Sequence, residues 1–238
     1  MYVTRNMLPQ GGEFDWSGFF TRQKAEEFFA RTDTHQLVLQ LRGLLVENRP
    51  LFTFVFSRML RSLLEGMDLG GKSVLELGAG TGFLTRWMMH EGGASGVLVD
   101  SSADARRAYD QLPEESKARI EYVMADLFAY TTDRRFDIAC SNGVIEHFTD
   151  KTEVLRAHRR HLADGGSILL LVPMDTPLTR IYYELHPELN LGYRELWTKN
   201  ELCALLASHG MEVLKVETSR GYIYDMLGAT CRDRKEGR

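Results

Sequence analysis

Apolar residues recur with two different periods along the chain, and the period changes between Leu64 and Leu69. From about residue 19 to residue 64 they return every three or four positions, which predicts helices. Pro50 is expected to separate two of these helices, because proline disfavours helical geometry in the residue before it. We therefore expect a helical N-terminal extension over residues 1–66. It is either a layer that covers an edge of a sheet or a lid whose aromatic side chains line a substrate pocket.

From residue 67 onward, short apolar runs alternate with helical patterns, which is typical of a largely parallel sheet with helices on both faces. Five strands and a closing hairpin-like pair are expected at residues 73–77, 97–100, 120–124, 136–140, 167–172, 211–217 and 221–230. Helices are expected after Gly82, after Ser101 or Ser102, and over residues 150–162 and 198–210. The pattern predicts one α/β domain over residues 67–238, with a proline- and tyrosine-rich insertion at residues 173–197.

Composition narrows the class of protein. The 238 residues are 44% hydrophobic and 26% charged, which suits one soluble domain with an extension. A net charge of -4 argues against a nucleic-acid partner, although a local basic patch stays open. The three cysteines form no CxxC pair, and the N-terminus has neither a signal-peptide core nor a transmembrane run. We expect a cytoplasmic protein without a membrane partner, whose oligomeric state is open and for which a homodimer is possible.

The segment Ser73–Gly82 is the first candidate for a binding site. An apolar run ends there in three alternating glycines, Gly78, Gly80 and Gly82, and a helical segment follows at once. Glycine lets a backbone approach a ligand closely, and a helix N-terminus offers unpaired N–H donors. Asp100 follows Gly78 at the end of the next expected strand, where a carboxylate can accept hydrogen bonds from ribose hydroxyls. These residues predict an adenosine-type ligand without separating NAD from other adenosine cofactors, and Asp100 could instead only cap a helix.

The motif Glu76-Leu77-Gly78-Ala79-Gly80-Thr81-Gly82 resembles the first motif of the class I S-adenosylmethionine (SAM)-dependent methyltransferases. The resemblance extends over about residues 69–230 and implies a Rossmann-like, seven-stranded, mostly parallel sheet whose last strand is antiparallel. It also implies SAM as the cofactor and S-adenosylhomocysteine (SAH) as the product. The residues that it assigns to the cofactor are Glu76, Gly78, Ala79, Gly80 and Gly82 around the methionine part, Asp100 at the ribose, Asp126 and Leu127 at the adenine, and Asn142 at the methionine end. Ser101, next to Asp100, is a further candidate for binding the cofactor.

The fourth expected strand leads into Glu146-His147-Phe148, which is similar to a segment of small-molecule methyltransferases. The N/D-P-P-Y/F tetrad of the base-amine DNA methyltransferases is missing from this turn. The resemblance therefore implies a small-molecule methyl acceptor, and we favour oxygen over nitrogen or carbon. A hydroxyl or ammonium acceptor must lose a proton, and His147 is the candidate catalytic base because imidazole titrates near neutral pH. Alternatively, His147 only packs beneath the site, and Glu146 orients it or binds the cofactor.

Other interpretations stay open at this point. Residues of the insertion could contact the acceptor in place of His147, namely Tyr182, Tyr183, His186 and Tyr193. The sequence shows no histidine and carboxylate cluster, so we expect no metal. A methyltransferase of the same fold acting on protein or RNA, a nicotinamide-dependent oxidoreductase and a non-catalytic SAM-binding protein are the alternative functions.

Overall fold

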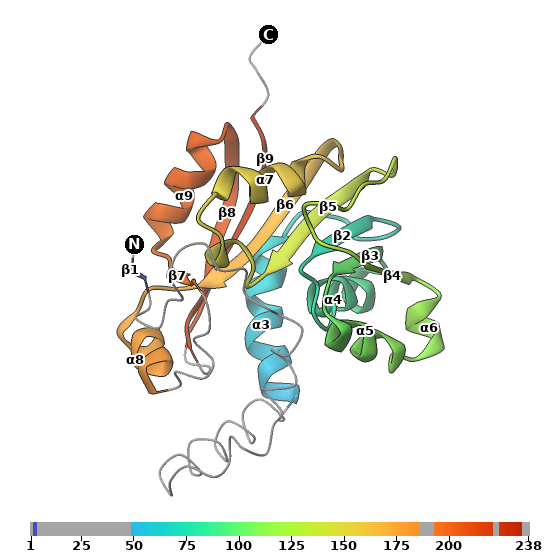
Figure 1. Ribbon diagram of the computed structural model, residues 1–238, viewed down its shortest axis with the longest axis horizontal. Coiled ribbons are helices and arrows are strands. Elements are labelled where there is room, and N and C mark those ends of the chain that lie inside the picture. Colours follow the sequence, from blue (N-terminus) through green and yellow to red (C-terminus); the bar gives the residue numbers. More distant parts are fainter. Residues whose placement is uncertain (1, 4–48, 186–192, 221–223, 235–238) are drawn as a thin grey trace, which may run out of the picture.

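The computed structural model describes residues 2–3, 49–185, 193–220 and 224–234, with side chains from Phe56 onward in the second range. Its centre is a seven-stranded sheet in the order β4-β3-β2-β5-β6-β9-β8 (Figure 1). The strands are β2 (Ser73–Leu77), β3 (Ser95–Asp100), β4 (Ile120–Met124), β5 (Phe136–Asn142), β6 (Leu162–Pro173), β8 (Met211–Ser219) and β9 (Met226–Asp233). Of these seven strands, β9 alone runs opposite to the other six, and it pairs antiparallel with β6 and β8. The predicted sheet, with an antiparallel last strand, is confirmed.

The largest differences from the expected strand boundaries are the starts of two strands, each shifted by five residues. Strand β6 begins at Leu162, because Phe136 already pairs with Leu162, and a register shift between Phe136 and Ile138 absorbs the extra residues before Ser167. Polar residues and glycines fill this first part of β6, so its apolar pattern starts late. Strand β9 begins at Met226, five residues later than predicted, and residues 221–223 lie outside the described part.

Helices cover both faces of the sheet. On one face lie α3 (Arg49–Leu63) and α4 (Phe83–Gly92), and on the other lie α7 (Lys151–Arg159) and α9 (Lys199–Ser208). Side chains of β6 alternate between the two cores, with Leu169 and Leu171 toward α3 and α4 and Leu170 toward α7 and α9. Near β4 lie α5 (Ala103–Asp110) and the short α6 (Glu114–Lys117).

The described part of the N-terminal extension packs as a layer. Helix α3 begins at Arg49 with Pro50 in its first turn, where proline is tolerated because that N–H has no helical partner. Phe56, Leu60 and Leu63 are buried against the sheet. The expected earlier helix, and with it the lid interpretation, falls on residues 4–48, outside the described part. The boundary at residue 66 stays a prediction.

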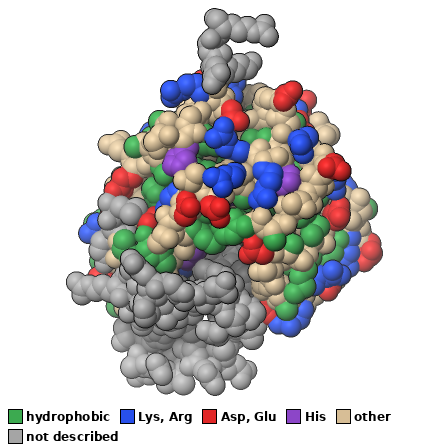
Figure 2. Space-filling model, turned by 45° about the horizontal axis from the view of Figure 1, so that its top comes forward, with side chains coloured by type: hydrophobic (Ala, Val, Ile, Leu, Met, Phe, Trp, Pro, Cys, Tyr) green, Lys and Arg blue, Asp and Glu red, His purple; other side chains and the backbone are tan. Residues whose placement is uncertain are grey.

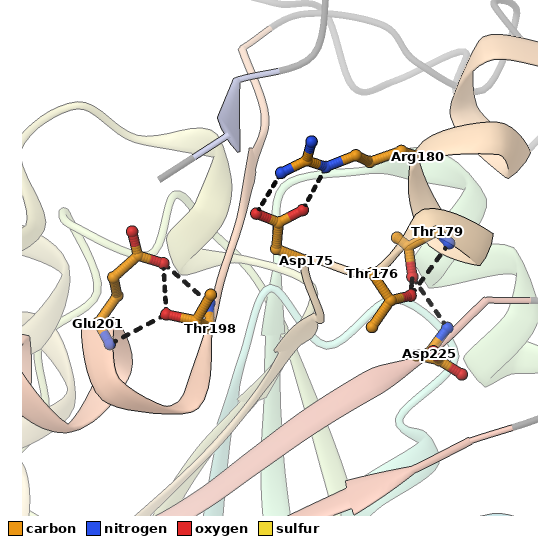
Figure 3. A network of polar contacts seen from close by, with 7 residues as sticks. All are labelled: Asp175, Thr176, Thr179, Arg180, Thr198, Glu201 and Asp225. Atoms are coloured by element: carbon orange, nitrogen blue, oxygen red, sulfur yellow. Dashed lines mark hydrogen bonds and ion pairs between the residues drawn. The ribbon is translucent and has the colours of Figure 1, made fainter.

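The insertion at residues 173–197 contains α8 (Pro177–Leu185) and β7 (Glu195–Leu196), which pairs antiparallel with β1 (Tyr2–Val3). Figure 3 shows how α8 is tied down: the Asp175 carboxylate accepts two hydrogen bonds from Arg180, at 2.6 and 2.8 Å. The buried Thr179 hydroxyl accepts from the Asp225 backbone N–H at 3.1 Å, which joins the helix to the segment before β9. The capping box predicted at Thr198 and Glu201 starts α9. The described residues of the insertion are therefore packed onto the domain.

The described surface shows mixed charge. On the face displayed in Figure 2, Lys and Arg side chains are interspersed with Asp and Glu. Several of these charges form exposed pairs, such as Arg134 with Glu121 at 2.7 Å and Arg159 with Asp233 at 2.8 Å. None of the helices in the described ranges has the length and apolar character that a membrane span requires.

Candidate active site

The glycine loop lies where the strand order of the sheet reverses. Strand β2 has β3 on one side and β5 on the other, and this switch point is where open α/β sheets bind ligands at the carboxyl ends of their strands. Gly78, Gly80 and Gly82 have φ values of 61°, 53° and 68°. A Cβ at Gly78 would lie 2.6 Å from Val144 Cγ2, and one at Gly82 would lie 2.5 Å from Leu98 Cδ1. Conformation and close packing both require glycine in this loop.

Glu76 lies beneath the loop. It is 1% exposed, and its two carboxylate oxygens accept hydrogen bonds from the backbone N–H groups of Leu84 at 3.3 Å and Thr85 at 2.8 Å. These donors belong to the first turn of α4, whose N-cap, Gly82, has no side chain to satisfy them. Burial raises the pKa of Glu76 to about 7, and the backbone donors oppose this shift. Glu76 thus supports the loop and the helix start, and its predicted contact with the cofactor stays a prediction.

Asp100 ties the glycine loop to the end of β3. Its Oδ2 accepts from the Gly80 backbone N–H and its Oδ1 from the Ser102 backbone N–H, both at 2.8 Å. Burial raises the pKa of Asp100 above its usual value. Because each carboxylate oxygen has a further lone pair, the ribose contact remains available to this residue. Ser102 is the N-cap of α5, whereas Ser101 is exposed and keeps its assignment to the cofactor only as a prediction.

Two further residues predicted to bind the cofactor lie at the ends of β4 and β5. Asp126 is exposed, and its Oδ1 accepts from the Phe128 backbone N–H at 2.7 Å, which fixes the turn that contains the half-buried Leu127. Asn142 is the last residue of β5 and is half-buried. Since β4, β3, β2 and β5 are adjacent parallel strands, Asp126, Asp100, the glycine loop and Asn142 all lie at the carboxyl ends of these strands, on the same side of the sheet.

These residues fit an adenosine cofactor such as SAM. The glycine loop leaves no room for a Cβ at Gly78 or Gly82, so its backbone can lie very close to another group. The carboxylate of Asp100 lies at the end of the adjacent strand. That combination suits a ligand with a ribose and a polar chain next to a helix N-terminus.

His147 lies in a short 3-10 helix, Ile145–His147, that follows β5. Its Nδ1 is 2.7 Å from the backbone carbonyl oxygen of Tyr193. Because a carbonyl oxygen only accepts, Nδ1 carries the ring proton and Nε2 is the acceptor nitrogen of the neutral ring. Burial lowers the pKa of His147 well below its usual value, and the nearby positive charges of Arg194 and Lys151 lower it further. The ring is therefore neutral. The hydrogen bond from Nδ1 to the Tyr193 carbonyl, which belongs to the insertion, makes Nε2 the basic nitrogen.

Charged side chains surround His147 although the region is buried. Glu146 is 2% exposed, and burial raises its pKa to about 7, which Arg194 and Lys151 oppose. Lys151 Nζ lies 2.6 Å from Glu195 Oε2 and donates to the carbonyl oxygens that begin and follow the 3-10 helix, those of Ile145 and Phe148. The short helix is thus held by an ammonium group, which is itself balanced by a buried carboxylate.

Sequence reasoning missed three of these charges, Lys151, Arg194 and Glu195. Arg194 is 5% exposed, and its guanidinium lies 4.4 Å from the ring centroid of Tyr183. The Tyr193-Arg194-Glu195 run inside an aromatic insertion was the available signal, but charged residues are ordinarily exposed, so their burial could not be read from type alone.

The aromatic residues of the insertion that were predicted to contact the acceptor have different surroundings. Tyr183 is buried against Tyr182 and Tyr224, with ring centroids 5.3 and 5.6 Å away. Tyr193 donates its hydroxyl hydrogen to Glu195, while its backbone carbonyl faces His147. His186 lies outside the described residues. Within the described ranges, no group of three or more His, Cys, Asp or Glu side chains is placed to hold a metal ion.

The curated relatives of the chain include ubiquinone biosynthesis O-methyltransferases. Ubiquinone biosynthesis O-methyltransferase from Pseudomonas fluorescens is 32% identical over 107 residues, which are 44% of this chain and 45% of that protein. The enzyme of the same name from Pseudomonas paraeruginosa is 27% identical over 160 residues, 63% of this chain and 68% of that protein. The first match therefore spans less than half of the relative's length.

Solved structures share the fold at low identity. Magnesium protoporphyrin IX methyltransferase from Synechocystis, with bound SAH, has a TM-score of 0.63 at 14% identity and covers 90% of this chain and 94% of its own. The 1,6-didemethyltoxoflavin-N1-methyltransferase from Burkholderia thailandensis has a TM-score of 0.61 at 17% identity, covering 87% and 92%. A family model described as a methyltransferase domain matches residues 47–216. The chain belongs to this methyltransferase-domain family, which confirms the resemblance to the class I SAM-dependent methyltransferases.

Proposed function

We propose that the chain transfers a methyl group from SAM to a small-molecule acceptor, at oxygen in preference to nitrogen or carbon. The observation that carries this proposal is the neutral His147 ring, whose Nδ1 is 2.7 Å from the Tyr193 carbonyl and whose Nε2 is thereby the acceptor nitrogen. The relatives in Pseudomonas are named O-methyltransferases, which supports oxygen. The toxoflavin enzyme, which has the same fold, is named as a methyltransferase of a nitrogen atom, N1. The fold is therefore compatible with more than one acceptor atom, and the preference for oxygen depends on the residues of the site.

SAM supplies a methyl group on a positively charged sulfur. The residues of this chain bind SAM, align the acceptor with the methyl group and remove the proton of the acceptor. The glycine loop with Ala79 and Asn142 holds the methionine part, Asp100 with Ser101 the ribose, and Asp126 with Leu127 the adenine. Glu76 contributes by fixing the start of α4. Methyl transfer is an in-line displacement, so alignment and exclusion of water supply much of the acceleration. His147 accepts the proton of the acceptor at Nε2.

The test begins with calorimetry of the full chain against SAM, SAH and NAD separately. We expect SAM and SAH to bind, and preferential binding of NAD would refute the function. Transfer of labelled methyl from SAM is then measured with a panel of phenols and amines. His147→Ala should lower turnover with phenols by roughly 10²–10⁴-fold, the usual contribution of a general base.

His209→Ala is the matched control, because His209 is the C-cap of α9 and precedes the start of β8, at the opposite end of the strands from the glycine loop. Both variants should bind SAH like the wild type. Unchanged turnover in His147→Ala would remove this residue from the mechanism while leaving the methyltransferase activity in place. The cytoplasmic location and the possibility of a homodimer stay predictions from the sequence.

A further inference from the structure

The carboxylate of Glu146, the residue before the candidate base, has one oxygen without a hydrogen-bond donor among the described residues. Glu146 is 2% exposed, and nothing in the described part of the chain donates a hydrogen bond to its Oε2. A buried acceptor without a donor is destabilising, and native proteins contain few of them. The arrangement is therefore suited to a donor that comes from a bound molecule.

Nε2 of His147 is a second acceptor, and it lies near the other oxygen of the same carboxylate. Glu146 Oε1 lies 3.9 Å from His147 Nε2. That distance is too long for a hydrogen bond between the two, but one donor atom can lie about 2.8 Å from both of them. Because the neutral His147 ring carries its hydrogen on Nδ1, both of these atoms are acceptors. A hydroxyl group at this position donates its one hydrogen to either of the two atoms while its oxygen lies within reach of both.

The turn after β5 leads directly to this carboxylate. Gly143 follows Asn142 and has a φ of 72°, and a Cβ built on it would lie 3.4 Å from Glu146 Oε1. Since Gly143 has no side chain, Oε1 borders the backbone of the turn that we assign to the methyl-donating end of SAM. On the other side of the turn, Val144 packs against Gly78 of the glycine loop. Glu146 thus lies next to the place where the acceptor has to meet the methyl group.

Burial, more than the surrounding charges, decides which of the two atoms holds the proton. The groups whose charge acts on the pair come from the 3-10 helix, α7, α8 and the β7 region, namely His147, Lys151, Tyr183, Arg194 and Glu195. Burial lowers the pKa of His147 well below its usual value, and Arg194 and Lys151 lower it further. Burial raises the pKa of Glu146 to about 7. A carboxylate that titrates near neutral pH is the better final position for the proton.

We propose that Glu146 is a second catalytic residue, which binds the hydroxyl of the methyl acceptor together with His147 and takes its proton. This inference rests on the proposed function, and it narrows the acceptor to hydroxyl groups that must be deprotonated, such as phenols. The O–H bond of the acceptor breaks as its proton moves to Nε2 of His147, and Nε2 then gives a proton to the carboxylate of Glu146, where a new O–H bond forms. The oxygen uses its electron pair to bond the methyl carbon, while the electron pair of the S–C bond returns to sulfur and yields SAH. Glu146 later releases the proton to solvent.

The experiment compares wild type, Glu146→Gln and Glu146→Asp in methyl transfer from SAM to phenols whose pKa values run from about 7 to about 10. Rates are measured between about pH 6 and about pH 9, and SAH affinity and thermal midpoint show whether the variants are folded. Glu217→Gln is the matched control, because it makes the same change at a half-buried carboxylate of β8 that accepts from the Ser62 hydroxyl at 2.8 Å and is not among the groups that act on Glu146 and His147.

We expect Glu146→Gln to bind SAH normally and to lose roughly 10²–10⁴-fold in rate with the least acidic phenols at neutral pH. The loss should shrink as the phenol becomes more acidic, because an ionised phenol needs no base. Glu146→Asp should restore part of the rate, and Glu217→Gln should keep the wild-type dependence on phenol acidity.

Wild-type rates in Glu146→Gln, or a loss that is the same for every phenol and every pH, would overturn the assignment of Glu146 while the proposed function stands. A wild type that methylates none of the phenols would refute the oxygen acceptor, and the Glu146 assignment with it.

Discussion

The backbone carbonyl of Tyr193 and the imidazole of His147 are 46 positions apart in the sequence and are joined by a 2.7 Å hydrogen bond. Tyr193 belongs to the insertion and His147 to the turn after β5, so a segment outside the central sheet sets the tautomer of the candidate base. The geometry of His147 therefore depends on whatever holds the insertion in place.

One such support is the ion pair between Lys151 and Glu195, at 2.6 Å with both side chains at most 10% exposed. Lys151→Met should destabilise the fold by about 3–5 kcal/mol, because it leaves the Glu195 carboxylate buried and uncompensated. Urea unfolding measures this loss. The double variant Lys151→Met with Glu195→Gln removes both charges and should recover part of the stability. If the two single changes simply add, the pair is not coupled and this view of the cluster is wrong.

Gly78→Ala should damage the glycine loop in two ways. Its φ of 61° disfavours any side chain, and its Cβ would lie 2.6 Å from Val144 Cγ2. The matched control is Gly165→Ala, since Gly165 has a φ of 77° but nothing within 4 Å of an added Cβ. The control should lose about 1–2 kcal/mol of unfolding free energy from conformation alone, and Gly78→Ala should lose more and also bind SAH less tightly.

Adding Val144→Ala separates the two effects in Gly78→Ala. Removing the valine methyl groups relieves the contact but leaves the backbone strain, so the double variant should recover SAH affinity in part. Equal losses in Gly78→Ala and Gly165→Ala would show that the contact with Val144 is unimportant.

Asp100→Ala should weaken SAH binding by roughly 10- to 100-fold, which corresponds to about 1–3 kcal/mol. The change removes the carboxylate proposed to hold the ribose and also frees the Gly80 and Ser102 N–H groups that it accepts from. Asp110→Ala is the control, because Asp110 forms only an exposed pair with Arg106, at 2.9 Å. Calorimetric titration with SAH measures both, and wild-type affinity in Asp100→Ala would overturn the ribose assignment.

Elements with a regular apolar pattern could be predicted from the sequence. The strand, glycine turn and helix around Gly78 follow from local residue types, and the alternating strands and helices determine a parallel sheet whatever the exact boundaries. The start of β6 was missed because Leu162 pairs with Phe136 through a register shift, which depends on the partner strand.

The candidate site could be predicted only where a residue type has a fixed local use. Glycines in the loop and an acid at the end of β3 are such cases. The burial of Lys151 and Glu195 could not be predicted, because it depends on two segments meeting: α7 and β7 are far apart in the sequence, and each charge is tolerated only because the other is present. Glu76 was recognised as a motif residue, but its role under α4 required the position of the Leu84 and Thr85 N–H groups.

The burial of Glu76 beneath α4 predicts that the free energy of unfolding depends on pH. The pKa of Glu76 is raised by burial from 4.5 to about 7, so the folded state favours the neutral carboxyl more than the unfolded state does. The resulting stabilisation is complete below about pH 4.5 and is lost as the pH rises through about 7, up to about 3 kcal/mol at about 1.4 kcal/mol per pKa unit. Glu76→Gln cannot ionise and lacks this loss. The unfolding free energy of the wild type minus that of the variant should therefore fall between about pH 5 and about pH 8. Other titrating groups cancel in this difference, and a difference that stays constant with pH would show that Glu76 has an ordinary pKa in the folded protein.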